Sequence, residues 1–297
     1  MFFNPAGRSI KWPILLGVCI SLTIVQAYEE WSYVEGSNGT SQWADKFPQC
    51  AGPAQSPIRL PGDIKIIIPP ELFYFSLMND NRKQYEVYEV IFHWGSDDAR
   101  GAEHWLYGKQ YQMETQVYGF NKLLYPTKER ALAGPNGIAV LSFVHEVCTD
   151  VTKDETLIGV MSGLYETVLN YHNSTQHKYL DGFDMVRMLG IVDRARYFRY
   201  QGSLTTPPCT ENVVWTIFKN TAPILPNQLE VFRTLRDMVN GEEYRMANNY
   251  RPTMKLNNEE TYMPRKVYST LNGAKQRSPA GVVITLLVGY VLKALYV

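Results

Sequence analysis

Short stretches rich in β-branched and aromatic residues alternate with turn sequences along most of the chain. Their length and composition are typical of β-strands, and the sequences between them, such as Gly-Pro-Asn-Gly at 134–137, are typical of turns. The predicted strands span residues 85–94, 112–120, 137–147, 195–203 and 211–219. The pattern therefore predicts a mostly β domain, and no internal repeat interrupts it.

One segment has helical rather than strand periodicity. It spans residues 227–241, begins with Asn227 and Glu230 at capping-box spacing, and ends at Gly241. The apolar positions that recur on one face are Leu229, Phe232, Leu235 and Val239. We predict an amphipathic surface helix that packs on the sheet.

The N-terminal segment has the order of features found in a secretory signal peptide. Arg8 and Lys11 precede an unbroken apolar run, and Val-Gln-Ala at 25–27 is a small-residue cleavage site. A buried N-terminal helix is the alternative, but the run is early and continuous. We predict that residues 1–27 are removed.

The C-terminal residues 280–297 form a second apolar segment. The small residues Asn272, Gly273 and Ala274 and a short polar spacer precede it, which is the layout of a glycolipid-anchor signal. A single membrane span is the alternative, because 18 residues can just cross a bilayer. We expect attachment at Asn272, a stalk over residues 265–279, and a folded part on the extracellular face of the plasma membrane.

Glycosylation and cysteine patterns agree with an extracellular location. Sequons begin at Asn38 and Asn173, and Cys19 lies in the predicted signal peptide. The cysteines left in the mature chain are Cys50, Cys148 and Cys209. An oxidising compartment favours one disulfide and one odd thiol, and cysteine arithmetic leaves the pairing open.

Composition narrows the class of partner. The 297 residues carry 29 basic and 29 acidic side chains, so there is no net positive charge to attract nucleic acid. The apolar fraction, 45%, is ordinary for a folded protein. Residues 28–264 show no linker-like change in composition, which predicts one domain.

Five sequence blocks resemble, in the same order, blocks of the α-type carbonic anhydrase family. They are WSYVEGSNGTSQW with CAGPAQSPI, FHWGSDDARGAEH, GPNGIAVL, YQGSLTTPPCTENVVW and NNYRPTMKLN. The resemblance implies a central twisted mixed, mainly antiparallel sheet with short peripheral helices. It also implies a disulfide between Cys50 and Cys209, leaving Cys148 as a small core residue.

The family holds a catalytic zinc ion through three neutral imidazoles and a hydroxide. By resemblance, the three ligand positions fall on Ile91, His93 and Gln116, so only one imidazole is retained. Thr205 and Glu103 match the threonine that orients the hydroxide and the glutamate that accepts the threonine's proton. The resemblance therefore implies a carbonic anhydrase-related protein in which the family's zinc cofactor is lost.

Other family positions near the site are retained. Glu114 matches the carboxylate behind the third ligand, and His104 matches a histidine outside the ligand set. Trp215 and Thr206 match positions in the wall of the pocket. Buried hydrogen-bonded groups also hold loops in place, so these residues do not by themselves indicate activity.

The chain is shorter than the family pattern between Ile58 and Tyr85 by several strand-and-turn units. The absent stretch would carry the histidine that shuttles protons to solvent. We expect residues 62–77, which include the apolar sequence Ile-Lys-Ile-Ile-Ile, to complete the sheet edge. A splice form or a faulty gene model, with a product that does not fold stably, is the alternative explanation of the gap.

Together these features predict a cell-surface protein without catalytic activity that acts as a binding or adhesion module. Its expected partners are an extracellular protein of unknown identity and the membrane, through a C-terminal lipid anchor. The alternative is a zinc carbonic anhydrase with residual reversible hydration of carbon dioxide.

Overall fold

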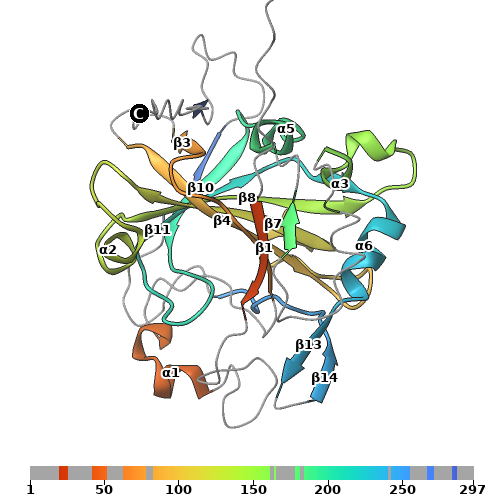
Figure 1. The fold of residues 1–297 in the computed structure, drawn as a ribbon, viewed down its shortest axis with the longest axis horizontal. Coiled ribbons are helices and arrows are strands. Elements are labelled where there is room, and N and C mark those ends of the chain that lie inside the picture. Colours follow the sequence, from red (N-terminus) through yellow and green to blue (C-terminus); the bar gives the residue numbers. More distant parts are fainter. Residues whose placement is uncertain are drawn as a thin grey trace, which may run out of the picture.

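The computed structural model describes residues 20–25, 42–51, 63–77, 83–160, 164, 178–180, 184–239, 242–254, 266–270 and 283–285. These residues form a mostly β domain around one large sheet, with short helices at its periphery (Figure 1). The fold class predicted from the sequence is confirmed.

Twelve strands make up the sheet, and nine of them follow one another in the order β15-β10-β11-β8-β7-β4-β2-β1-β9. The strands of this path are β1 Ile20–Val25, β2 Asp63–Ile67, β4 Tyr85–Trp94, β7 Met113–Asn121, β8 Ile138–Val147, β9 Lys178–Leu180, β10 Tyr197–Gly202, β11 Val213–Phe218 and β15 Tyr268–Ser269. Off the path, β12 (Ala222–Ile224) pairs with β8, and β3 (Tyr74–Ser76) lies between β4 and β16 (Val283–Thr285). The pairs β8–β11 and β8–β12 are parallel and the other pairs are antiparallel, so the sheet is mixed.

The remaining elements are short. The helices are α1 Trp43–Lys46, α2 Lys128–Ala133, α3 Leu157–Val160, α5 Met185–Gly190 and α6 Pro226–Arg233, with 3-10 turns η2 Pro48–Ala51 and η3 Lys153–Glu155. Two hairpins stand apart from the sheet: β5 (Trp105–Leu106) with β6 (Lys109–Gln110), and β13 (Arg236–Val239) with β14 (Glu242–Arg245). Among the described residues, no helix has the length and apolar character that a bilayer crossing requires.

The five strands predicted from the sequence correspond to β4, β7, β8, β10 and β11. Every residue of β7 is buried, because side chains of the strand alternate between two apolar layers. Val117 belongs to the layer under α6, and its neighbour Tyr118 belongs to the opposite layer. The central strands thus carry a core on both faces.

Residues 62–77 contribute two short strands that pair with β4, but neither is an edge strand, since β1 and β16 pair with their other sides. Strand β2 pairs with Glu89–Phe92 of β4, and β3 pairs with Tyr85 and Glu86 at the other end of the same strand. Strand β1, which pairs with β2, falls within the predicted signal peptide. Cleavage after Ala27 stays a prediction, and it would remove β1 from the sheet.

The predicted helix 227–241 is only partly correct. Helix α6 ends at Arg233, and residues 236–239 instead form β13. The capping residue is also different, since the Gln228 side chain accepts the Leu225 N–H at 3.0 Å in place of the Asn227–Glu230 box. Asn240 and Gly241, outside the described residues, connect β13 to β14, and Asn-Gly is a strong hairpin sequence that competes with helix termination.

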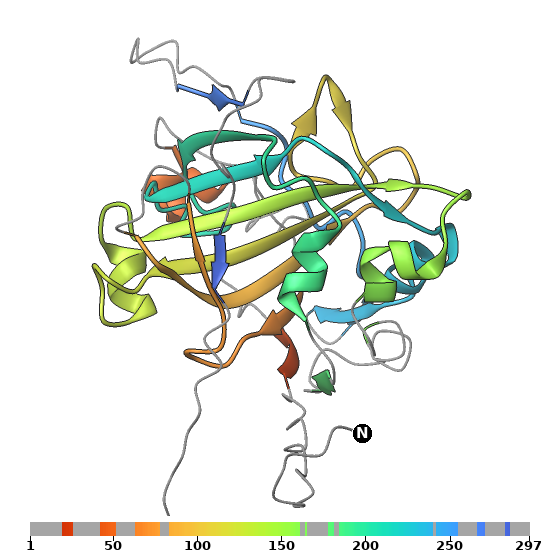
Figure 2. The ribbon, with the colours of Figure 1, turned by 90° about the horizontal axis from the view of Figure 1, so that it is seen from above.

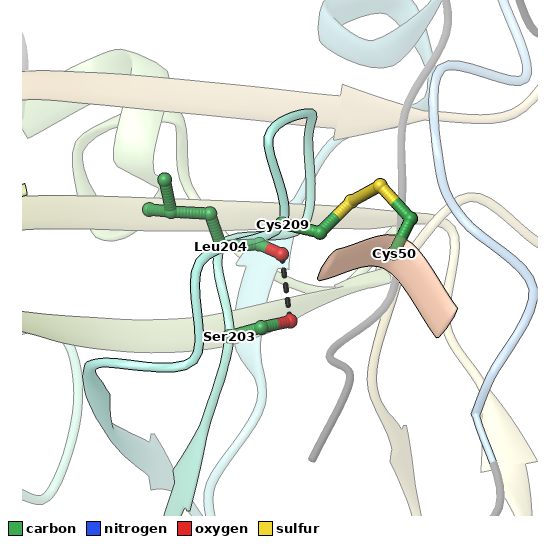
Figure 3. The surroundings of a disulfide bond; sticks show 4 residues. All are labelled: Cys50, Ser203, Leu204 and Cys209. Carbon is green, nitrogen blue, oxygen red and sulfur yellow. Dashed lines mark hydrogen bonds between the residues drawn. A yellow bond between two sulfur atoms is a disulfide. The ribbon is translucent and has the colours of Figure 1, made fainter. Parts of the chain in front are cut away.

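A disulfide joins Cys50 of η2 to Cys209 in the loop after β10, the pairing implied by the family resemblance (Figure 3). In the same loop, the Ser203 hydroxyl donates to the Leu204 carbonyl at 2.8 Å. Cys148 is the free cysteine of the described residues. We expected it in the core, but it is only half-buried. The predicted sites Asn38, Asn173 and Asn272 lie outside the described residues.

Candidate functional site

Two neighbouring strands bring together Ile91, His93 and Gln116, the positions that the family resemblance led us to expect as the ligand positions. In the β4–β7 pair, Ile91 lies opposite Gln116 and His93 lies opposite Glu114. Residues two apart on a strand share a face, so Ile91, His93 and Gln116 point to the same side of the sheet. Ile91 is 3% exposed and the two polar side chains are completely buried. The site is therefore in the interior of the domain.

The side-chain amide of Gln116 is the centre of a hydrogen-bond network. Its Nε2 donates to Glu103 Oε2 at 2.8 Å and to Glu114 Oε1 at 2.9 Å. Its Oε1 accepts the phenolic hydrogen of Tyr118 at 2.7 Å. Both amide hydrogens and one lone pair are thus used by buried partners of this chain.

Glu114 is held as a carboxylate. It accepts hydrogen bonds from the His104 backbone N–H at 2.8 Å and the Ser142 hydroxyl at 2.6 Å, and lies 2.8 Å from His104 Nδ1. Burial raises the pKa of Glu114, but His104 and the hydrogen-bond donors outweigh burial and lower it to about 2. His104 is itself fixed by a 2.7 Å contact between its Nε2 and the Tyr200 hydroxyl.

The pKa of Glu103 is shifted in the opposite direction to that of Glu114. Burial, and then the nearby charge of Glu114, raise the pKa of Glu103 well above its usual range. The Gln116 amide, the Thr205 hydroxyl and the charge of Arg251 oppose this rise only in part. The Arg251 backbone N–H donates to Glu103 Oε1 at 3.0 Å. The site thus contains two buried carboxyl groups whose pKa values are pushed apart.

His93 is oriented by Asn249. His93 Nδ1 lies 2.6 Å from the Asn249 carbonyl oxygen, which can only accept, so Nδ1 carries the proton. The Asn249 side chain is fixed in turn by the Trp94 N–H at 2.6 Å and the Phe92 carbonyl at 3.0 Å. The other ring nitrogen, Nε2, lies 3.6 Å from Glu103 Oε2. The retained imidazole keeps an orientation in which Nε2 faces the site.

Apolar side chains fill the rest of the site. Ile91 and Tyr118 belong to one buried cluster with Leu204 and Trp215. The Tyr118 and Trp215 rings meet edge to face at 6.2 Å between centroids. Tyr118 was not predicted as a site residue, although it follows Gln116 by two positions on the same strand and the period of two would have placed it there.

The remaining residues that the sequence placed near the site differ in burial. Thr205 is buried, and its hydroxyl contributes to lowering the pKa of Glu103. Trp215 donates its ring N–H to the Ser203 carbonyl at 2.9 Å. Thr206 and Glu89 are half-buried, and Glu89 lies opposite Tyr118 beside an irregularity in the β4–β7 pairing.

His145 belongs to neither the network nor the ligand positions. It is buried, its Nε2 lies 2.8 Å from Thr115 Oγ1, and burial lowers its pKa to about 3. His172 and His177 lie outside the described residues. In the described part of the chain, no three His, Cys, Asp or Glu side chains are grouped as metal ligands would be.

The sequence family model of the eukaryotic-type carbonic anhydrase matches residues 68–265. The chain belongs to this family. Human carbonic anhydrase 12 is 26% identical over 303 residues, which cover 89% of this chain and 79% of that protein. A human carbonic anhydrase-related protein is 31% identical over 179 residues, which cover 58% of this chain and 59% of the relative.

A third relative is similar to this chain over a small part of a larger protein. Human receptor-type tyrosine-protein phosphatase zeta is 28% identical over 284 residues, covering 83% of this chain but only 12% of the phosphatase. The relatives' names thus include carbonic anhydrases, a carbonic anhydrase-related protein and a receptor. Activity has to be argued from the residues of this chain.

Proposed function

We propose that this protein is a cell-surface member of the carbonic anhydrase family that does not hydrate carbon dioxide and acts as a binding module. The observation that carries the proposal is the use of the Gln116 amide by Glu103, Glu114 and Tyr118 within the chain. A residue at a ligand position that already bonds three buried partners has little capacity left for a metal ion.

The donor chemistry supports the same conclusion. A catalytic zinc site has three protein ligands with nitrogen, sulfur or carboxylate donors. Of the three family ligand positions, only His93 offers such a donor, since Ile91 is a hydrocarbon and Gln116 has a neutral amide oxygen. These residues do not fit the zinc ion of the family, so we derive no catalytic step through it.

The retained carboxyl groups have a structural role that accounts for their presence. Glu103 accepts from the Arg251 backbone and from Gln116, and Glu114 accepts from His104 and Ser142. These bonds tie β7 to the segments on either side of it. Loss of any one leaves a buried polar group unpaired, at about 1–3 kcal/mol. The network therefore stabilises the domain without any reaction.

A binding role is supported by the occurrence of a similar domain within a protein named as a receptor-type phosphatase. We propose an extracellular protein as the partner, since the balanced charge of the chain gives no attraction to nucleic acid. The proposed location is the extracellular face of the plasma membrane, reached through signal peptide 1–27 and held by a glycolipid at Asn272.

Metal analysis of the processed full-length protein tests the loss of catalysis. We expect zinc well below one equivalent per chain and carbon dioxide hydration no faster than in buffer, measured by stopped flow. A family member with three histidine ligands, purified in the same way, is the control. One equivalent of zinc, with activity blocked by an aromatic sulfonamide, would establish the alternative of a zinc carbonic anhydrase.

Enzymatic release tests the anchor. A phospholipase specific for glycolipid anchors should transfer the protein from intact cells to the medium, and Asn272→Trp should abolish surface display. Retention of a protein that still contains Lys293 would instead support a transmembrane span.

A further inference from the structure

Exposed apolar side chains gather on one edge of the domain. Eight large hydrophobic side chains of the described residues are exposed, and four of these lie on the β5–β6 hairpin or in the segment that contains β15. They are Trp105 (53% exposed), Tyr107 (70%), Val267 (43%) and Tyr268 (65%). All three aromatic members of the exposed set are included. In Figure 2, the hairpin (gold) and β15 (blue) lie along the same upper margin of the molecule.

The hairpin presents its aromatic tip in a defined conformation. Tyr107 and Gly108 have φ values of 54° and 78°, as the two central residues of a tight hairpin turn require. Tyr107 packs edge to face on Phe198 of β10, with ring centroids 6.0 Å apart. The exposed rings are therefore held at the surface by the fold.

The same edge contains Thr270, which lies close in sequence to the predicted anchor. Thr270 follows β15, and its backbone N–H donates to the Tyr197 carbonyl at 3.1 Å. Its hydroxyl accepts the Tyr197 N–H at 2.9 Å, and its carbonyl accepts from the Lys219 ammonium group. Only one residue separates Thr270 from Asn272, the predicted attachment site.

Lys219 links Thr270 to the aromatic β5–β6 hairpin. Besides its bond to Thr270, its Nζ lies 4.8 Å from the centre of the Phe198 ring, on which Tyr107 packs. Lys109 lies 4.4 Å from the centre of the Tyr111 ring, and Lys266 is exposed beside Val267. The edge thus combines tryptophan, tyrosine and lysine side chains, the composition that proteins place at membrane–water interfaces.

We infer that this edge, formed by the β5–β6 hairpin and β15, lies against the phospholipid bilayer in which the chain is anchored. Trp105 and Tyr107 insert their rings at the level of the headgroups, and Lys219 and Lys266 face the lipid phosphates. The inference rests on the proposed anchor, because an anchor next to Thr270 brings this edge to the membrane first. Leu123 and Leu124, which are also exposed, follow the other end of β7 and are not part of this edge.

Tryptophan quenching by bromine-labelled phosphatidylcholine tests this orientation in the processed, anchored protein reconstituted into vesicles. Trp43, Trp94 and Trp215 are at most 1% exposed and are shielded from the lipid. Trp31 lies outside the described residues, so all proteins carry Trp31→Phe. We expect brominated lipid to quench part of the emission, Trp105→Phe to remove that part, and Tyr107→Trp to increase the quenched fraction.

Two controls make each outcome decisive. Replacing Leu123 and Leu124 by Gln removes comparable exposed apolar surface at the far end of β7, and should leave quenching unchanged. Flotation with the vesicles reports the anchor separately. A protein that does not float contradicts the proposed anchor. A protein that floats but shows no Trp105-dependent quenching, with Tyr107→Trp also unquenched, overturns the inference and leaves this edge as a surface for a protein partner.

Discussion

Tyr118 donates its phenolic hydrogen to Gln116 Oε1 at 2.7 Å, and both side chains are almost fully buried. Gln116 occupies a position that the family resemblance assigns to a zinc ligand, and Tyr118 lies two residues along on the same strand face. The pair fills the interior of the site, since the Gln116 amide orients the Tyr118 ring and this ring occupies the space beside Ile91.

Introducing imidazoles at positions 91 and 116, the expected ligand positions, tests how far this pair obstructs metal binding. The variant Ile91→His with Gln116→His should bind zinc weakly, because Tyr118 loses its acceptor and its ring still fills the site. Adding Tyr118→Val should raise the zinc affinity by about 10-fold or more, the scale on which groups around a metal site alter affinity. Competition with a chromophoric chelator measures both constants. Equal affinities would show that Tyr118 is no obstacle.

Hydration activity should stay low even in the triple variant if, as the family resemblance implies, the segment before β4 is shortened and without the family's proton-shuttle histidine. Turnover close to that of an intact carbonic anhydrase would mean that the shortening has no effect on the chemistry.

Removal of the Gln116 amide should destabilise the domain. In Gln116→Leu, the Tyr118 hydroxyl loses its acceptor, and Glu103 and Glu114 each lose a donor. We expect the free energy of unfolding to fall by about 1–3 kcal/mol, the range for unsatisfied buried groups. Urea denaturation followed by tryptophan fluorescence measures the change.

The matched control is Gln201→Leu at an exposed position of β10, where the change should be within about 0.5 kcal/mol. A Gln116→Leu protein as stable as the wild type would argue that the network contributes nothing to the fold.

His145 should make stability depend on pH. Burial lowers its pKa to about 3, whereas the unfolded imidazole takes up a proton near pH 6.5. Between these values the unfolded state binds more protons. The free energy of unfolding therefore falls as the pH is lowered from 6.5 toward 3, by at most about 1.4 kcal/mol per pH unit from this group.

His145→Gln keeps a hydrogen-bonding group beside Thr115 but cannot titrate, so the slope of unfolding free energy against pH should flatten in this interval. Thr115→Val is the control, since it removes the 2.8 Å contact and leaves the imidazole able to titrate. An unchanged slope in His145→Gln would show that His145 is not the group responsible.

The disulfide should be a large contributor to stability. Cys50→Ser is expected to lower the free energy of unfolding by about 2–5 kcal/mol, as removal of a native disulfide does in secreted domains. Cys148→Ser, at the half-buried free thiol, should have a small effect. Peptide mapping without reduction checks the pairing, and a bridge from Cys148 to either partner would contradict it.

The sequence predicted the strands well, because β4, β7 and β8 contain long runs of β-branched and aromatic residues. Such runs identify a strand from local sequence alone, without knowledge of its partners in the sheet. It was wrong for residues 236–239, where Leu235 and Val239 continue the helical spacing of α6. Asn240 and Gly241 favour a hairpin there, and the periodicity of a short amphipathic run does not reveal which signal wins.

For the site, the family resemblance predicted which residues lie at the ligand positions. The period of two along a strand predicted that Ile91 and His93 share a face. The hydrogen bonds between Gln116 and the carboxyl groups could not be predicted, because Glu103 comes from a loop whose path depends on tertiary packing. Arg251 and Asn249 approach the site from far along the chain for the same reason.

The parallel pairing of β8 with β11 has a consequence for how the chain folds during synthesis. Strands β4, β7 and β8 are antiparallel neighbours in the sheet and lie within residues 85–147, so they can assemble as soon as Val147 has been made. The strand beside β8 on its other side begins only at Val213, and pairing over such a separation is slow. A nascent chain therefore exposes the open flank of β8, with its apolar residues, until β11 arrives. The nascent chain should be most prone to aggregation during this interval, because its apolar strand edge is unpaired.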